Sequence, residues 1–359
     1  MPTLDQSLTL PCGARLPHRF ALAPLTNLQS NQDGSLHQDE LRWLERRAGH
    51  FGLVSTCAAS VSEDGRAWPG QLGIHHDGLI PGLERLATAL RRTGSVAIVQ
   101  IHHGGDKAER SASKISTVDR EGVRGASEAD LERVVGDFVA AARRAERAGF
   151  DGVELHGANG YLFTQFLAPE DNPRTDAYGG DRAGRARLLR EALRAVRAAT
   201  APGFAVGVRL SPVDVWSQRG LVLADGVQVA RWMAEDGADF VHLSLKDAAG
   251  PAPFEDTGVV VARAVRDALP PEVPVISAGG VWTRADAARA AAAGADIVAI
   301  GKAAIVHPDW PEASRAAGFA PLRPPWDPDH LRRVDVGPDF VDYLMRFPGL
   351  VAGGAVARA

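Results

Sequence analysis

The chain has 359 residues, of which 45% are hydrophobic and 23% charged, and its formal net charge is −4. This composition is typical of a globular protein, and the mild negative charge excludes a basic surface for nucleic acid. Two cysteines, Cys12 and Cys57, are too few for a disulfide framework or an iron–sulfur cluster, and we predict no metal site. Segment 1–10 lacks the pattern of a signal peptide, and no apolar run reaches the ~20 residues of a membrane span, so we expect a cytoplasmic protein without a membrane contact.

Short apolar strands alternate with helical segments along the chain. The pattern at 8–23 predicts a hairpin that turns near Gly13 and leads into the first strand. The predicted strands lie at 20–23, 53–56, 96–101, 153–155, 205–210, 240–244, 275–277 and 297–300. The predicted helices lie at 38–48, at 79–93, from a cap at Ser127 to Gly149, in an arginine- and leucine-rich segment ending at Ala199, at 227–236, and from a cap at Thr283 to Gly294.

Eight apolar strands separated by helical segments predict the α/β class and a single (β/α)8 TIM barrel with an N-terminal hairpin. We find no linker inside the barrel, so residues 1–319 are expected to form one domain. Residues 320–359, rich in proline and arginine, are expected to form a C-terminal extension that packs on the barrel or at an interface.

The strand at 153–155 ends in a loop that carries His156, Asn159 and Tyr161 among glycines, and a long loop at 168–180 follows. Glycines allow sharp turns close to a ligand, so this segment indicates a site. The alternative is a turn in which His156 and Asn159 satisfy local backbone groups. In a TIM barrel the carboxyl ends of all eight strands meet at the active site, so polar residues that follow other strands are expected to converge here.

The last two strands end in glycines and a cation. Gly279 and Gly280 follow strand seven, and Gly301 and Lys302 follow strand eight. Backbone N–H groups and a lysine at these positions can hold a phosphate, and this is the usual phosphate site of TIM barrels. The alternative is that the glycines serve only a steric need.

Three polar residues near other strand ends suit a flavin mononucleotide, FMN. Gln100 can pair in both directions with the donors and acceptors of the flavin pyrimidine edge. Arg209 is a permanent cation that would stabilise the negative charge of the reduced ring, and Thr26 can donate to a carbonyl oxygen. The alternative for Gln100 and Arg209 is polar pairing inside the barrel.

The chain resembles the old yellow enzyme family of FMN-dependent ene-reductases as far as about Pro308. The segment from His156 to Leu162 with a downstream RTDxYGG pattern is specific, and the other motifs add to it. The motifs are APLTN at 23–27, GQLGI at 70–74, VQIHHGGDKA at 99–108, GFDGVELHGANGYLFTQFLAPEDNPRTDAYGG at 149–180, VRLSP at 208–212, SAGG at 277–280 and AIGKAAIVHPDW at 299–310.

This resemblance implies a role for each site residue. His156 and Asn159 are expected to bind the carbonyl oxygen of the substrate, and Tyr161 to donate a proton. The residues expected to touch the flavin ring are Pro24, Thr26, Ala58, Gln100 and Arg209. The residues expected to hold its phosphate are Gly279, Gly280, Gly301 and Lys302.

The expected activity is the ping-pong reduction of an activated C=C bond in an α,β-unsaturated carbonyl compound, with NADH or NADPH as hydride donor. The partner is then a small-molecule enone, and the chain is a possible homo-oligomer. Three alternatives remain open: a flavin-free barrel isomerase or lyase for a phosphorylated metabolite, a scaffold with a dead site, and a specialised biosynthetic flavoenzyme of the same family.

The sequence departs from the family pattern at several positions. Asp106 and Lys302 stand where arginine is frequent, and Asp106 reverses a charge expected near the cofactor. Leu28 stands where one branch of the family has an active-site tyrosine, and Thr26 where that branch has cysteine. These departures leave the nicotinamide preference open.

Overall fold

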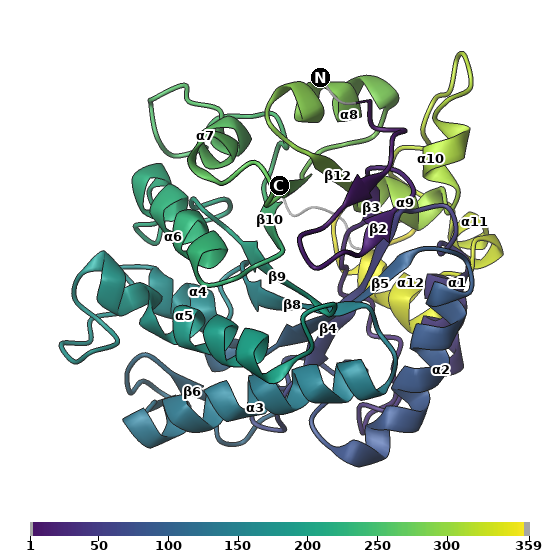
Figure 1. Ribbon diagram of the computed structural model, residues 1–359. Coiled ribbons are helices and arrows are strands. Elements are labelled where there is room, and N and C mark those ends of the chain that lie inside the picture. The colour runs from purple at the N-terminus through teal and green to yellow at the C-terminus, as the bar shows by residue number, and fades with distance from the viewer. Residues whose placement is uncertain (1–2, 355–359) are drawn as a thin grey trace.

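The computed structural model describes residues 3–354; residues 1–2 and 355–359, the outer ends of the predicted segments 1–319 and 320–359, lie outside it. Eight parallel strands close into a barrel, which confirms the (β/α)8 prediction (Figure 1). In order around the barrel they are β3 (Phe20–Leu22), β4 (Leu53–Ser60), β5 (Val96–His102), β8 (Gly152–Gly157), β9 (Ala205–Leu210), β10 (Phe240–Ser244), β11 (Val275–Ala278) and β12 (Ile297–Ile300).

Helices surround the strands on the outside of the barrel (Figure 1). They are α1 (Gln38–Glu45), α2 (Ile80–Arg91), α3 (Glu128–Arg147), α4 (Leu162–Leu167), α5 (Arg182–Ala199), α6 (Leu223–Glu235), α7 (Val261–Ala268), α8 (Arg284–Ala292), α9 (Lys302–Val306) and α10 (Trp310–Ala313). Capping boxes start two of them, with Ser127 and Asp130 at α3 and Thr283 and Asp286 at α8. None of the helices among residues 3–354 is both long and apolar enough to cross a membrane.

Several elements differ from the sequence-based expectations, among them β4, α4 and α7. Strand β4 continues to Ser60 instead of ending at residue 56, because Cys57, Ala58 and Ala59 remain buried in the sheet after a bulge between Ser55 and Ala58. Helix α4 begins directly after Tyr161, and α7 precedes β11, although neither was predicted. Helix α4 has only six residues and all are buried, so it has no polar face, and α7 is amphipathic but only eight residues long.

The interior of the barrel is apolar at its amino-terminal end. Phe240, Ile276 and Ile98 pack there, and Gly207 leaves room for the Phe240 ring, because a Cβ at this glycine would lie 2.1 Å from that ring. The predicted hairpin is present as β1 (Leu8–Thr9) and β2 (Arg15–Leu16), and its leucines pack onto the same apolar cluster. The strands therefore rest on an apolar base, and their carboxyl ends carry the polar residues.

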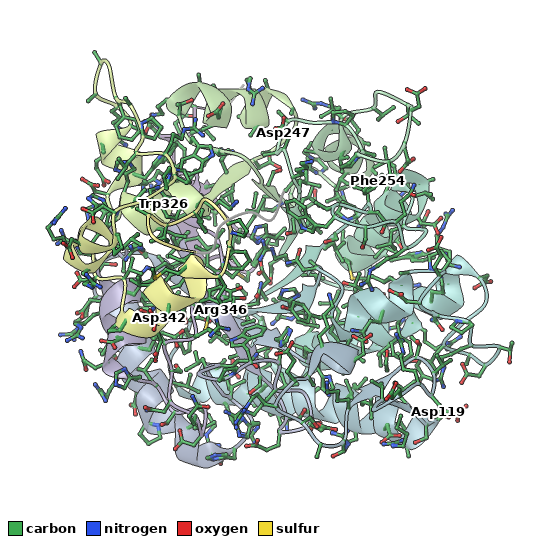
Figure 2. All side chains as sticks on the ribbon, turned by 180° about the vertical axis from the view of Figure 1, so that it is seen from behind. Asp119, Asp247, Phe254, Trp326, Asp342 and Arg346 are labelled. Atoms are coloured by element: carbon green, nitrogen blue, oxygen red, sulfur yellow. The ribbon has the colours of Figure 1, made fainter. Side chains whose placement is uncertain are left out.

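The C-terminal segment contains α11 (Pro328–Arg333) and α12 (Pro338–Met345), in yellow in Figure 1. The indole of Trp43 on α1 packs edge-on against Phe340 on α12, with ring centroids 5.7 Å apart. The buried guanidinium of Arg47 donates to the carbonyl oxygens of Ala304 and Val334, at 2.9 and 3.2 Å. Figure 2, which labels Trp326, Asp342 and Arg346, shows this segment lying against the barrel.

Candidate active site

Three aromatic side chains meet at the carboxyl end of β8. The ring centroid of Tyr161 lies 5.2 Å from that of His156 and 4.4 Å from that of His102, which ends β5. Trp68 closes this group, with its ring 5.4 Å from His102 and 6.0 Å from Tyr161. His156 at the end of β8 and Tyr161 on the following loop therefore lie in one cluster of aromatic rings.

Hydrogen bonds orient His156. Its Nδ1 accepts from the backbone N–H of Ala158 at 3.3 Å, so the ring proton of the neutral imidazole lies on Nε2. Burial lowers the pKa of His156 to about 3, and the nearby Arg209 acts in the same direction. At neutral pH, His156 is thus an uncharged N–H donor.

Asn159 is held by a chain of hydrogen bonds from Arg209. The guanidinium donates to Oγ of Ser244 at 3.1 Å, and Ser244 donates to Oδ1 of Asn159 at 3.1 Å. The backbone of Asn159 is left-handed, with φ of 61°, and its N–H donates to Ser211. Because the amide oxygen accepts from Ser244, the amide NH2 remains as a donor.

The phenol of Tyr161 is largely buried against residues from distant parts of the chain. Burial raises its pKa to about 12, and the neighbouring Tyr343 on α12 adds to this effect. Leu28 and Trp68 belong to the same apolar cluster, against which Tyr161 and Tyr343 pack. The side chain of Thr26 also interacts with the Tyr343 hydroxyl. The phenol of Tyr161 therefore stays protonated at neutral pH.

A fully buried polar layer lies two residues nearer the amino-terminal ends of β5 and β8 than His102 and His156. It is formed by Gln100, Glu154 and His242. Nε2 of Gln100 donates to Oε1 of Glu154 at 2.6 Å, and Nδ1 of His242 donates to Oε2 of Glu154 at 2.7 Å. Burial alone raises the pKa of Glu154, but His242 and then Arg209 outweigh it, so the pKa lies below its usual value. One N–H of the Gln100 amide is thus already used, which restricts the two-way pairing expected from the sequence.

Arg209 lies beside this layer, and only some of its N–H groups have hydrogen-bond partners among residues 3–354. Its guanidinium donates to the backbone oxygen of Pro24 at 3.4 Å and to Ser244, and its buried Nε has no hydrogen-bond partner among residues 3–354. A buried donor without a partner is costly, which indicates that a ligand completes the site. Ala58 lies across the sheet from Gln100 and is buried beside it.

A cavity of about 390 Å3 connects Arg209 to the ends of β11 and β12. Its lining includes Gly279, Gly280, Gly301 and Lys302, the residues for which the sequence predicts a phosphate site. Gly280 has a φ of 63°, and a Cβ at Gly279 would lie 2.6 Å from the backbone oxygen of Leu245. These two glycines are required by the turn itself, so the steric explanation holds for them, and it is compatible with the predicted phosphate site.

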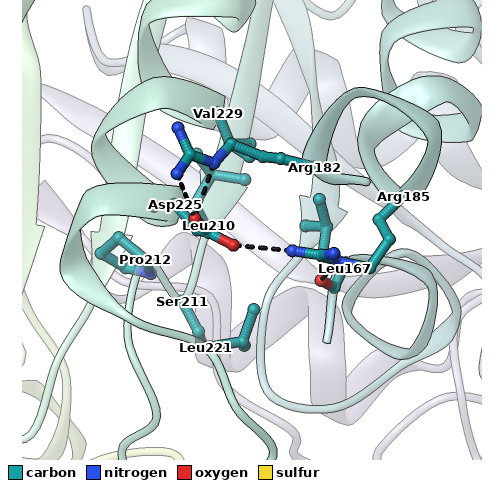
Figure 3. Close-up of a pocket in the computed structure, with 10 residues that line it drawn as sticks. Leu167, Arg182, Arg185, Leu210, Ser211, Pro212, Leu221, Asp225 and Val229 are labelled. Atoms are coloured by element: carbon teal, nitrogen blue, oxygen red, sulfur yellow. Dashed lines mark hydrogen bonds and ion pairs between the residues drawn. The ribbon is translucent and has the colours of Figure 1, made fainter. Parts of the chain in front are cut away.

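A second, much smaller cavity of about 10 Å3 lies between the end of β9 and helices α5 and α6, and its lining includes Leu210 and Pro212 (Figure 3). Asp225 on α6 accepts from Arg182 and Arg185, each at 2.6 Å, and these ion pairs join α5 to α6. This cavity contains no room for a ligand, and its charges are already paired.

Asp106 does not lie at the predicted phosphate site. Its carboxylate accepts from Gln165 at 2.6 Å and pairs with Arg120 at 3.2 Å, on the side of the barrel where β5 ends. The charge reversal seen in the sequence is therefore balanced locally. Lys107, the next residue, instead contacts the site: its ammonium lies 5.3 Å from the centre of the Tyr161 ring.

Several site residues were missed in the sequence. Glu154 lies in the quoted motif at 149–180, two residues before the specific segment, and its even spacing from His156 along a strand was the available signal, because both then face the barrel interior. His102 lies within the quoted motif at 99–108, and Trp68 lies just before the motif at 70–74, but no further signal singled them out. Tyr343 gave none, because α12 is remote in sequence from the rest of the site.

Comparison with known proteins identifies the family. A family model described as the NADH:flavin oxidoreductase / NADH oxidase family matches residues 12–317. The probable NADH-dependent flavin oxidoreductase YqiG of Bacillus subtilis is 35% identical over 324 residues, 86% of each chain, and an NADPH dehydrogenase of Bacillus licheniformis is 37% identical over 65% of this chain and 70% of its own.

The solved structure of morphinone reductase in complex with tetrahydroNAD is 27% identical, with a TM-score of 0.77 and coverage of 92% of this chain and 94% of its own. The family match extends over the barrel and includes every predicted site residue. The match confirms the prediction of FMN with NADH or NADPH as hydride donor. The alternative of a flavin-free isomerase or lyase is therefore excluded. The chain belongs to the NADH:flavin oxidoreductase / NADH oxidase family, that of old yellow enzyme, and is an FMN-dependent oxidoreductase.

Proposed function

We propose that this oxidoreductase reduces the activated C=C bond of small α,β-unsaturated carbonyl compounds. The observation that carries the proposal is the pair of oriented donors at the end of β8, His156 and Asn159, which have no acceptor among residues 3–354 and lie next to the protonated phenol of Tyr161. When bound, FMN accepts hydride from NADH or NADPH and supplies it to the substrate.

The residues present fit FMN. The 390 Å3 cavity holds Lys302 and the two glycine turns at one end, where a phosphate would be held. Arg209, whose buried Nε has no hydrogen-bond partner among residues 3–354, also lines this cavity, and the ring would lie between it and the oriented amide of Gln100. Pro24, Thr26 and Ala58 would border the ring.

His156 and Asn159 would stabilise the negative charge that develops on the carbonyl oxygen. Nε2–H of His156 and the amide NH2 of Asn159 are set before the reaction by their partners Ala158 and Ser244. Donors that are already oriented in a space of low dielectric stabilise such charge more strongly than water does. A neutral imidazole is suited to this role, because it donates without giving up its proton.

Tyr161 would protonate the α-carbon of the enolate. Its raised pKa keeps the proton on the phenol until a strongly basic carbon accepts it, and the group is not itself one of the carbonyl ligands. Leu28, Trp68 and Tyr343 pack around the phenol and limit its contact with solvent, so the proton is expected to come from Tyr161.

Isotope labelling tests this function. With deuterated nicotinamide and 2-cyclohexenone, the product is expected to carry deuterium at the β-carbon. With unlabelled nicotinamide in D2O, deuterium is expected at the α-carbon. Oxidation of the nicotinamide without any reduced enone product would contradict the proposal and would leave a nicotinamide oxidase.

A further inference from the structure

Glu154 is a buried carboxylate that the proposed reaction does not use. It lies on β8 with no exposed surface, directly across the sheet from Gln100 on β5, and two residues before His156. A buried carboxylate costs several kcal/mol of solvation, which is tolerated only where partners are well placed. Glu154 has two such partners, the amide of Gln100 at 2.6 Å and the imidazole of His242 at 2.7 Å.

The first consequence concerns the orientation of Gln100. A carboxylate only accepts hydrogen bonds, so the amide nitrogen of Gln100 must face Glu154. The amide oxygen of Gln100 then faces away from Glu154. This orientation offers an acceptor to a ligand above the layer, and the reverse orientation would place two oxygens against each other.

The second consequence concerns charge. Arg209 is the cation beside this layer, and its hydrogen bonds go to neutral groups, the backbone oxygen of Pro24 and the hydroxyl of Ser244. Burial lowers the pKa of His242, so this imidazole is neutral and Glu154 carries the negative charge of the pair. The charge of Glu154 therefore partly offsets that of Arg209 in a region of low dielectric, where charges act over longer distances than in water.

We propose that Glu154 is a positioning residue that sets the redox potential of the bound FMN, by orienting the Gln100 amide and by offsetting the charge of Arg209. This inference rests on the proposed placement of the flavin ring against Gln100 and Arg209. Arg209 favours the reduced, anionic ring, and Glu154 opposes this preference. The two residues together hold the potential at an intermediate value.

Glu154→Gln tests the charge with little change in shape. Binding of oxidised and of reduced FMN is measured fluorimetrically and anaerobically, and the midpoint potential is measured by dye equilibration. The ratio of the two dissociation constants is expected to shift in favour of reduced FMN by about tenfold or more, and each tenfold corresponds to ~30 mV for a two-electron couple. A ratio that stays within about twofold of wild type would overturn the inference.

Two variants separate charge from orientation. Glu154→Asp keeps the charge but shortens the reach to Gln100, so both affinities are expected to fall together while their ratio stays near wild type. Asp239→Asn removes another buried carboxylate of the barrel, which binds the N–H of Val206 at 2.8 Å at the amino-terminal end of β10. It is expected to leave the potential unchanged. A shift in Asp239→Asn equal to that in Glu154→Gln would overturn a specific role of Glu154.

Arg209→Met distinguishes failure of this inference from failure of the site assignment. If Arg209→Met lowers the potential and Glu154→Gln does not raise it, the role of Glu154 is wrong and the site stands. If neither variant changes FMN binding or potential, the ring lies elsewhere and both are wrong. Should Glu154→Gln fail to fold, Glu154→Met with His242→Leu removes the same charge, since apolar residues often replace a buried pair without loss of stability. The same shift toward reduced FMN is then expected, and its absence overturns the inference.

Discussion

The ring centroids of His156 and Tyr161 lie 5.2 Å apart with an interplanar angle of 87°, an edge-to-face contact at the end of β8. His156 is buried and Tyr161 is largely so, yet burial acts on them in opposite ways: it lowers the pKa of the imidazole, which stays neutral, and raises the pKa of the phenol, which stays protonated. One loop thus holds a neutral hydrogen-bond donor beside a weak acid. In the proposed reaction, His156 would stabilise charge on the carbonyl oxygen of the substrate, and Tyr161 would protonate its α-carbon.

Tyr161→Phe is expected to impair only the step that consumes the enone. Reduction of the flavin by nicotinamide should stay near wild type, whereas reoxidation by cyclohexenone should slow by roughly 10² to 10⁴, the usual contribution of a positioned general acid. Stopped-flow absorbance measures both half-reactions. Equal slowing of the two would indicate a structural residue, and slowing of neither would mean that another group delivers the proton.

Two controls accompany Tyr161→Phe: activated nitroalkenes as substrates, and variants of the two residues expected to donate hydrogen bonds to the carbonyl oxygen. Nitroalkenes should still reoxidise the flavin in this variant, because nitronates are stable without immediate protonation at carbon. His156→Ala and Asn159→Ala should instead weaken the binding of phenolate inhibitors and also slow hydride transfer to enones.

His156 should make the protein less stable in acid. Its pKa is about 3 in the folded chain and about 6.5 in an unfolded one, so between these values the unfolded state binds a proton that the folded state does not. The stability that the neutral imidazole contributes is complete above pH ~6.5 and is lost as the pH falls toward 3. Each such proton adds about 1.4 kcal/mol per pH unit to the slope.

Urea unfolding of wild type and His156→Gln between pH 7 and pH 4 measures that slope. The variant is expected to show a shallower dependence of the unfolding free energy on pH. His102 remains in both proteins and acts in the same direction, so part of the slope should persist. Identical slopes would show that His156 does not carry the predicted shift.

Arg209→Met should lower the potential of the flavin and weaken its retention. The reduced ring is anionic, and without the guanidinium its charge lies near apolar walls and Glu154. Redox titration against a reference dye measures the potential, and fluorescence of released flavin measures retention. An unchanged potential in a variant that still binds FMN would place the arginine away from the ring.

Lys302→Met should separate the binding of FMN from that of riboflavin. Lys302 begins α9 and lines the cavity assigned to the phosphate, and a hydrogen bond to a charged group contributes ~1.5–3 kcal/mol. FMN affinity should therefore fall by about 10- to 100-fold, while riboflavin, which has no phosphate, should bind as before. Lys114→Met, on the loop before β6 (Ile115–Ser116), is the matched control. Equal losses for both flavins would contradict a phosphate role.

The barrel was predictable because each strand is a compact apolar segment bounded by turn residues, and because Ser127 and Thr283 mark helix starts. The end of β4 was not, since Cys57, Ala58 and Ala59 suit a strand or a loop equally well. Burial on both faces of the sheet decides in favour of the strand, and that burial exists only in the closed barrel.

The upper part of the site was predictable because strand ends converge in this fold, so His156, Asn159 and Tyr161 had to lie near Arg209. The layer below was not, because pairing of Glu154 with His242 joins residues 88 positions apart. The packing of Tyr343 on Tyr161 was not predictable either. Tyr343 lies on a C-terminal helix whose position depends on contacts with Arg47 and Trp43.

Sequential anaerobic titration of the purified protein tests the proposed ene-reductase activity most directly. NADH or NADPH is added first, and the absorbance of the flavin is expected to bleach. After removal of the nicotinamide, 2-cyclohexenone is expected to restore the absorbance in proportion to the cyclohexanone formed. Flavin that bleaches with nicotinamide but stays reduced in the presence of cyclohexenone and of other activated alkenes would contradict the account.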